Sequence, residues 1–395
     1  MWFKRRAYLD VAAGIGGNPS SSHEEGRRAK AVLEEARVSI ARLTEVAPDD
    51  VIFTSGATES NALAILGSIR ALRGAGKHDF HALYLPSAHA SIIENMKLLA
   101  EEGVVVEPLP IKEYRVDTDA LRAMLCKETV LVSMDAVCGE TGVVWNTREV
   151  SQVLQKHGQK GYSLAPSGLV RTSQPVASRT AFLPVLHVDA SQAPLTEKIT
   201  RDHFGADLLT FDGAKVGAMH GIGVLIAHRT IPLVSLYRGG GQERGLRPGT
   251  EDAERAGMCA AALRAAAHSR VPFCTAAAHE RIRLIARIKE GIPDVYVQEG
   301  RTQAPNILSI SLPGRDTDYL VALMDEDGFA ISTRSACETD SDEGSRAVFA
   351  LTGDRERARA TLRISWGPDT PSRILIRFAH ALVRAIAFID RGYGR

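Results

Sequence analysis

One strand-to-helix turn in the sequence could hold a phosphate group. The segment TSGATESN, residues 54–61, follows a short apolar run and opens a helical pattern. Gly56, Ala57 and Thr58 would therefore present backbone N–H groups at the positive end of a helix, which is a good site for an anion. The same sequence also suits an ordinary capped turn, because Thr58 is an acceptable helix cap.

Two other predicted strands end in side chains that could act on a ligand. Asp189 and Gln192 follow the run VLHV, and Lys215 follows LLTF through an Asp-Gly-Ala turn. Since the carboxyl ends of parallel strands meet at one sheet edge, the acid and the amine would lie near each other. Each has a plainer explanation on its own: the acid could cap a helix, and the lysine could simply be solvated.

Together, these three features meet the needs of one cofactor. Pyridoxal phosphate (PLP) requires a phosphate-binding turn, an acid beside its pyridine nitrogen and a lysine that forms a Schiff base. The combination therefore favours a PLP-dependent enzyme.

Over nearly its whole length the chain resembles the cysteine desulfurases of the class V aminotransferase family, in the group I (NifS/IscS) type with a long cysteine loop. The resemblance implies fold type I of the PLP-dependent transferases. Besides the turns above, it rests on these segments: YLD at 8–10, GNPS at 17–20 with Ser22-His23, GATES at 56–60, Ala88-His89, GGGQERGLRPGT at 239–250, Ala304-Pro305-Asn306, and Ser335-Ala336-Cys337.

The resemblance implies a role for each cofactor-binding residue. Lys215 would form the internal aldimine, Asp189 would pair with the pyridine nitrogen, and Gln192 would approach the phenolic oxygen. His89 would stack on the ring and take part in catalysis. The remaining contacts are to phosphate: Gly56, Ala57 and Thr58 in the same subunit, and Thr250 reaching the phosphate of the neighbouring subunit in a homodimer.

The substrate side of the site would come from the C-terminal third of the chain. Cys337 lies in a polar segment, residues 332–344, that suits an accessible loop and a nucleophile that must move. Arg363 lies in a strand pattern, where its guanidinium could hold a substrate carboxylate with two hydrogen bonds or simply face water at a sheet edge. The resemblance favours the first role, and it implies a substrate contact for Asn18.

The other cysteines predict no metal or disulfide site. The five cysteines are scattered and form no CxxC pair, so neither a zinc site nor a disulfide framework is expected. Cys126 and Cys259 lie on helical patterns and are predicted to be buried packing residues.

The elements that position these residues form an α/β pattern. Seven β-rich runs alternate with amphipathic helices between about residues 24 and 270, which predicts a mainly parallel seven-stranded sheet. The predicted strands are 51–54, 82–86, 104–108, 130–134, 184–188, 208–211 and 223–227. The pattern changes at Val271-Pro272, between a predicted helix at 252–269 and another at 277–290. We therefore predict a large PLP-binding domain at 14–270, with a surface insertion at about 158–183, and a smaller α+β domain formed by 1–13 and 271–395.

Three departures from the family pattern affect the site. Asp212 and Ala214 stand where relatives carry a hydroxyl and a histidine that contact phosphate, Gly139 stands where many have asparagine, and an N-terminal helical segment is missing. A carboxylate beside a phosphate dianion would be repelled. We therefore expect Asp212 to point away from the phosphate and bind backbone N–H groups.

The expected activity is the conversion of L-cysteine to L-alanine, with the sulfur held as a persulfide on Cys337 and passed to an acceptor such as an iron–sulfur scaffold or a tRNA thiolation protein. Two alternatives remain. One is another PLP reaction, such as that of a selenocysteine lyase or aminotransferase, with Cys337 incidental; the other is a weakly catalytic relative that acts as a binding or regulatory partner.

Composition limits the partners and the location. With 48 basic and 47 acidic residues among 395, the formal net charge is +1, so no direct nucleic-acid partner is expected. No window is apolar enough for a membrane span. The basic N-terminal run is interrupted by Asp10 before any signal-peptide core, so a cytoplasmic protein is predicted.

Overall fold

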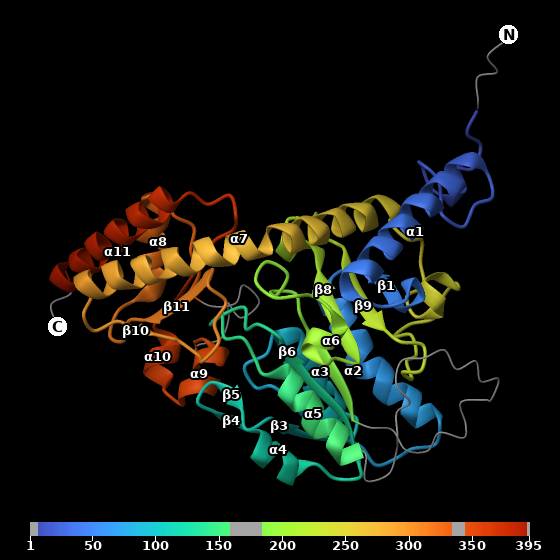
Figure 1. Ribbon diagram of the computed structural model, residues 1–395, viewed down its shortest axis with the longest axis horizontal. Coiled ribbons are helices and arrows are strands. Elements are labelled where there is room, and N and C mark those ends of the chain that lie inside the picture. The colour runs from blue at the N-terminus through green and yellow to red at the C-terminus, as the bar shows by residue number, and fades with distance from the viewer. Residues whose placement is uncertain (1–6, 159–183, 334–343, 393–395) are drawn as a thin grey trace.

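The computed structural model describes residues 7–158, 184–333 and 344–392 (Figure 1). The predicted insertion at about 158–183 therefore lies almost entirely outside the described residues, and Cys337 lies outside them too.

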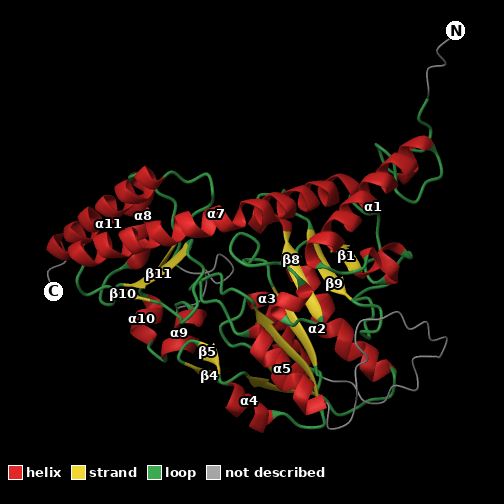
Figure 2. Ribbon diagram, in the orientation of Figure 1, coloured by secondary structure: helices red, strands yellow, loops and turns green. Residues whose placement is uncertain are grey.

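A seven-stranded sheet forms the centre of the larger part of the molecule, as predicted (Figure 2). Five neighbouring strands are parallel, and β9 runs antiparallel to both β8 and β1. Most of these strands are buried on both faces, as in other sheets covered by helices. In spatial order the strands are β1 (Val51–Thr54), β9 (Gly223–Ala227), β8 (Leu208–Asp212), β7 (Val185–Asp189), β6 (Thr129–Asp135), β2 (His81–Tyr84) and β3 (Val105–Pro108).

Helices and short turns surround this sheet. The strands β6, β7 and β8 all end at one edge, where the chain turns toward the helices. The elements around the sheet are α1 (Glu24–Thr44), α2 (Ala57–Gly74), α3 (Ala90–Glu101), α4 (Thr118–Met124), α5 (Thr147–Gly158) and α6 (Arg201–Phe204), the hairpin of β4 (Ile111–Lys112) and β5 (Arg115–Val116), and the 3-10 turns η1 (Val11–Ala13), η2 (Pro48–Asp50), η4 (Gly213–Val216) and η5 (Gln242–Gly245).

The smaller part of the molecule is an α+β unit with its own hydrophobic core. Its three strands form an antiparallel sheet in the order β10, β11, β12. The elements are β10 (Tyr296–Val297), β11 (Ile307–Ser311), β12 (Thr361–Ser365), α8 (Thr317–Glu326), α9 (Arg346–Thr352), α10 (Arg355–Arg359) and α11 (Ser372–Gly392).

One long helix, α7 (Ala253–Gly291), connects the two parts (Figure 1). The sequence pattern predicts two helices separated at Val271-Pro272, and that prediction is wrong, because the helix continues through Pro272. A proline inside a helix removes one backbone hydrogen bond and crowds the preceding turn. Here α7 packs against α1 in its first half and against α11 in its second, and this packing keeps it helical.

The division into domains stays a prediction, with one difference at the N-terminus. The larger hydrophobic cluster uses α7 up to Leu263, and the smaller one begins at Phe273. Residues 7–13, which we predicted to join the small domain, instead contact the start of α1: the Tyr8 ring lies edge-on to His23, and Asp10 accepts a hydrogen bond from Ser21. In the described part of the chain, no helix has the length and apolar character needed to cross a membrane.

Candidate active site

The carboxyl end of β7 holds Asp189 with both of its oxygens hydrogen-bonded. Oδ2 accepts from Asn61 Nδ2 at 2.7 Å, and Oδ1 accepts from the backbone N–H of Ser191 at 2.9 Å. The residue is 6% exposed. The carboxylate is therefore buried and fixed in orientation.

A chain of hydrogen bonds connects Asp189 with His89. Asn61 Nδ2 also donates to Ser91 Oγ at 2.9 Å, and Ser91 Oγ lies 2.8 Å from His89 Nδ1. His89 is the N-cap of α3 and accepts from the Ser91 N–H at 3.2 Å, so helix geometry and the side-chain network both orient its ring. Asn61 and Ser91 were not predicted as site residues.

The sequence holds a signal for Asn61. It lies four residues after Ala57 on α2, and residues at this spacing share one face of a helix. The helix that begins at the phosphate turn therefore directs Asn61 toward the same sheet edge.

Beneath this network, His187 is buried and neutral. Its Nδ1 lies 2.8 Å from Ser133 Oγ and its Nε2 lies 3.1 Å from Thr210 Oγ1. Burial lowers the pKa of His187 to about 4, against the opposing effect of the Asp189 charge. The ring is thus a fixed hydrogen-bonding spacer between three strands.

A second buried acid, Asp135, ends the neighbouring strand β6. It is aligned with Asp189 in the sheet, and its Oδ1 has no hydrogen-bond partner among the described residues. Burial, and next the negative charge of Asp189, raise the pKa of Asp135 well above its ordinary value. The sequence analysis missed this residue, although its position at a strand's carboxyl end matches that of Asp189.

Arg363 reaches from the small sheet to the segment that follows β6 of the large sheet. It lies in β12, and its Nη1 donates to the backbone oxygen of Gly139 at 3.2 Å. A Cβ added at Gly139 would lie 3.2 Å from Gln192 Nε2, so Gln192 occupies the space beside this glycine. The structure therefore brings Arg363 and Gln192 to the same short segment.

The last described residues before Cys337 lie beside Arg363. The Arg363 N–H donates to the Ser332 oxygen at 2.6 Å. Cys337 itself lies outside the described residues, but the segment that leads to it starts next to Arg363.

Lys215 lies in η4, directly after β8, and is exposed. The preceding Asp212 is the N-cap of this turn, and its Oδ1 accepts from the Ala214 N–H at 2.8 Å. The amine is thus carried on a short, capped turn at the same sheet edge as Asp189.

The predicted phosphate turn is partly satisfied by the protein's own groups. Asp212 Oδ2 accepts from the Ala57 N–H at 3.2 Å, and Thr54 Oγ1 accepts from the Gly56 N–H at 3.4 Å. Asp212 binds backbone N–H groups, as expected, but it does so inside the turn, so the expectation that it points away is wrong. The physical reason is that the helix end, with its unpaired N–H groups, attracts the carboxylate.

Asn18 and Thr250 lie next to each other. Asn18 Nδ2 is 3.5 Å from Thr250 Oγ1 and donates to the Ala13 oxygen at 3.2 Å. Their contacts are thus with the N-terminal segment that precedes α1.

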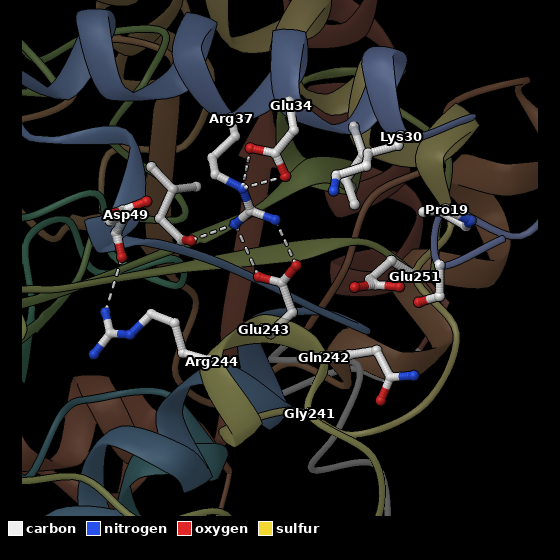
Figure 3. Close-up of a pocket in the computed structure, with 13 residues that line it drawn as sticks. Pro19, Lys30, Glu34, Arg37, Asp49, Gly241, Gln242, Glu243, Arg244 and Glu251 are labelled. Atoms are coloured by element: carbon white, nitrogen blue, oxygen red, sulfur yellow. Dashed lines mark hydrogen bonds and ion pairs between the residues drawn. The ribbon is translucent and has the colours of Figure 1, made fainter. Parts of the chain in front are cut away.

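A cavity of about 430 Å³ adjoins this region, lined by residues of α1 and of the 241–251 segment (Figure 3). Arg37 and Glu243 form a two-contact ion pair in its wall, with Nη2 to Oε1 at 2.6 Å and Nη1 to Oε2 at 3.0 Å. Glu243 also accepts from the Phe53 N–H at 2.8 Å. The pair therefore holds the 241–251 segment against α1 and β1.

The cysteines of the described residues differ in environment. Cys259 is buried as predicted, whereas Cys126 is exposed, contrary to its prediction, because α4 ends before it. Burial raises the pKa of both Cys138 and Cys259 to about 12. Both buried thiols therefore favour the protonated form, which is a poor nucleophile.

A family model, curated proteins and solved structures all match this chain over most of its length. A family model described as Aminotransferase class-V matches residues 6–161 and 179–372. A NifS/IcsS protein homolog from Lactobacillus delbrueckii subsp. bulgaricus is 33% identical over 365 residues, covering 91% of this chain and 87% of the relative. Cysteine desulfurase IscS 1 from Archaeoglobus fulgidus is 30% identical, covering 89% and 85%. The crystal structure of DndA from Streptomyces lividans is 29% identical, with a TM-score of 0.71, covering 91% of this chain and 94% of that one.

Proposed function

The chain belongs to the class V aminotransferase family, and on that premise we propose that it is a PLP-dependent cysteine desulfurase. It converts L-cysteine to L-alanine and keeps the sulfur as an enzyme persulfide. The observation that carries this proposal is the gathering at one sheet edge of the fixed Asp189 carboxylate, the His89 ring joined to it, and the Lys215 turn.

The residues at this edge fit the ring end of PLP. Besides the bound oxygens of Asp189, two buried acceptors beside it, Asn61 Oδ1 and Ser191 Oγ, have no hydrogen-bond partner in the part of the chain that the structure describes. Such atoms are expected where a polar ligand completes the site. Lys215 would hold the cofactor covalently, with His89 against its ring, Gln192 at its phenolic oxygen, and Gly56, Ala57 and Thr58 at its phosphate.

When bound, PLP supplies an electron sink that stabilises negative charge at the substrate Cα. Asp189 would hold a proton on the pyridine nitrogen, and its two donors keep the carboxylate in the one orientation that allows this. Lys215 would remove the Cα proton once substrate has displaced it.

Arg363 would bind the substrate's α-carboxylate. A guanidinium has five N–H donors in a planar fork, so the bond to Gly139 leaves others for a carboxylate. Because the residue lies in β12, the small domain would orient the substrate over the large domain's sheet edge.

Cys337 would accept the sulfur. Its thiolate attacks the substrate sulfur, an S–S bond forms, and the Cβ–S bond breaks with its electron pair going to Cβ, which takes up a proton. The products are a persulfide on Cys337 and alanine, so no external oxidant or reductant enters this step.

The remaining assignments follow from the family resemblance. Thr250 would reach the phosphate of the partner subunit in a homodimer, and Asn18 would contact the substrate. The persulfide would pass to an acceptor such as an iron–sulfur scaffold, in the cytoplasm.

The test is a single-turnover reaction of PLP-saturated protein with L-cysteine in the absence of reductant. We expect about one alanine per subunit and a persulfide on Cys337 in the wild type, and neither in Cys337→Ser. Equal alanine release from both proteins would contradict the proposal and favour another PLP reaction, such as that of a selenocysteine lyase or aminotransferase.

A further inference from the structure

We propose that Asp212 is a resident anion in the phosphate turn, which the phosphate of PLP must displace from the Ala57 N–H group. The inference rests on the proposed function, because it concerns the same cofactor. Asp212 would thereby control how tightly the protein binds the phosphate group of PLP.

The backbone fixes Asp212 next to the turn. Asp212 is the last residue of β8 and is paired with Gly223 of β9. A Cβ added at Gly223 would lie 2.4 Å from the carbonyl carbon of Gly56, so the start of α2 rests directly on this pair of strands. A side chain at position 212 therefore has the phosphate turn within reach.

Within this frame the carboxylate joins two elements. Oδ2 accepts from the Ala57 N–H at 3.2 Å and Oδ1 accepts from the Ala214 N–H at 2.8 Å. Ala57 is the first residue of α2, a helix of 18 residues, and its N–H is one of the four at the helix start without an acceptor inside the helix. Asp212 thus satisfies the helix end and also caps the turn that carries Lys215.

The second carboxylate at this helix end already has partners. Glu59 Oε2 accepts from the Ser55 N–H, and Oε1 accepts from Tyr237 Oη at 2.9 Å and Arg247 Nε at 3.3 Å. These hydrogen bonds lower the pKa of Glu59, although burial opposes them. Glu59 therefore stays anionic, with a cation beside it.

A phosphate dianion that approaches Ala57 would meet the Asp212 carboxylate at close range. Two like charges within about 4–6 Å disfavour each other enough to shift an equilibrium at least tenfold. Binding of PLP would therefore require the Oδ2 contact to break, while the shorter Oδ1 contact to Ala214 can hold the side chain nearby. The phosphate group should therefore add less to the affinity for PLP in the wild type than in a variant with an uncharged residue at position 212.

The experiment compares wild type with Asp212→Asn, which keeps the size and the acceptor oxygen but removes the charge. Apoprotein is titrated with PLP and with pyridoxal, which lacks the phosphate, by following the visible absorbance of the lysine-bound cofactor. In parallel, inorganic phosphate alone is tested for thermal stabilisation of each apoprotein. The matched control is Asp316→Asn, which removes a capping carboxylate from α8, where Asp316 accepts from the Tyr319 N–H at 3.0 Å.

We expect Asp212→Asn to bind PLP about tenfold more tightly than wild type and to bind pyridoxal equally well. Inorganic phosphate should stabilise Asp212→Asn more than wild type, and Asp316→Asn should behave as wild type in each assay. Equal or weaker PLP binding by Asp212→Asn would overturn the inference and leave the proposed function intact.

If the wild type and both variants failed to bind PLP and pyridoxal, the proposed function would be contradicted instead. The phosphate measurement would still decide the inference in that case. Equal stabilisation of wild type and Asp212→Asn by inorganic phosphate would overturn it.

Discussion

Asp135 and Asp189 are paired residues of the parallel strands β6 and β7, so two buried acids lie side by side at the edge where the site forms. Only Asp189 has donors on both oxygens. Burial, and next the charge of Asp189, raise the pKa of Asp135 well above its ordinary value. The pair therefore places an acid whose ionisation is disfavoured beside the acid that has two donors and would face the cofactor.

Asp135→Asn should reduce the loss of stability that accompanies a rise in pH above about 4. Because the folded-state pKa of Asp135 is raised, the folded protein binds more protons than the unfolded chain between about pH 4 and the folded pKa, and stability falls as pH rises through this range. We expect the free energy of unfolding of the variant to exceed that of wild type by more at pH 8 than at pH 5, with a slope of at most about 1.4 kcal/mol per pH unit. Denaturant unfolding at the two pH values measures this, and an equal difference at both would contradict it.

Asn61→Ala should weaken PLP binding and lower the turnover rate. The substitution removes the donor shared by Asp189 and Ser91 and leaves a buried carboxylate with one donor fewer. A lost hydrogen bond to a charged group corresponds to about tenfold in affinity. Asn146→Ala, which removes hydrogen bonds to Val116 and Glu149 and none to Asp189 or Ser91, is the control for a general loss of stability. Similar PLP affinities in both variants would exclude a specific role for Asn61.

Arg363→Lys should raise KM for L-cysteine about 10- to 100-fold, because an ammonium cannot form two parallel hydrogen bonds to a carboxylate. PLP affinity should stay unchanged, because the side-chain hydrogen bond of Arg363 within the described residues is to Gly139, which is not one of the proposed cofactor-binding residues. Arg315→Lys, at an ion pair with Asp294 and Asp390 on the far side of the small domain, serves as the control. An unchanged KM in Arg363→Lys would remove Arg363 from the substrate site.

Alkylation of the folded protein should distinguish the exposed cysteine Cys126 from the buried cysteines Cys138 and Cys259 by their reactivity. With a pKa of about 12, the Cys138 and Cys259 thiols are ionised in about one molecule in ten thousand at pH 8 and are also buried, so they should not react. Cys126, which is exposed, should react. Peptide mass analysis after brief iodoacetamide treatment gives the result, and rapid labelling of Cys138 would contradict its assigned environment.

The sheet could be predicted closely from the sequence because its strands are short apolar runs buried on both faces. Two of the predicted strands, Val51–Thr54 and Gly223–Ala227, match the structure at both ends. The positions of Asp189 and Lys215 at one edge followed from this pattern together with the rule for parallel strands.

Features that depend on tertiary packing could not be predicted in the same way. Pro272 is a strong local signal for a helix end, but contacts of α7 with α1 and α11 outweigh it. The bridging role of Ser91 depends on how α2 and α3 lie against each other, which no local pattern specifies. The orientation of Asp212 depends on an approach of Gly223 to Gly56 that joins segments 167 positions apart in the chain (223 minus 56).

The continuity of α7 has a mechanical consequence. Its 39 residues, with a rise of about 1.5 Å each, form a helix nearly 60 Å long that packs in the hydrophobic cores of both halves of the molecule. Arg363 and Gly139, which are hydrogen-bonded to each other, belong to the two halves that this helix connects. Pro272 cannot donate a backbone hydrogen bond to the His268 oxygen, so any bending of α7 should occur mainly at Pro272.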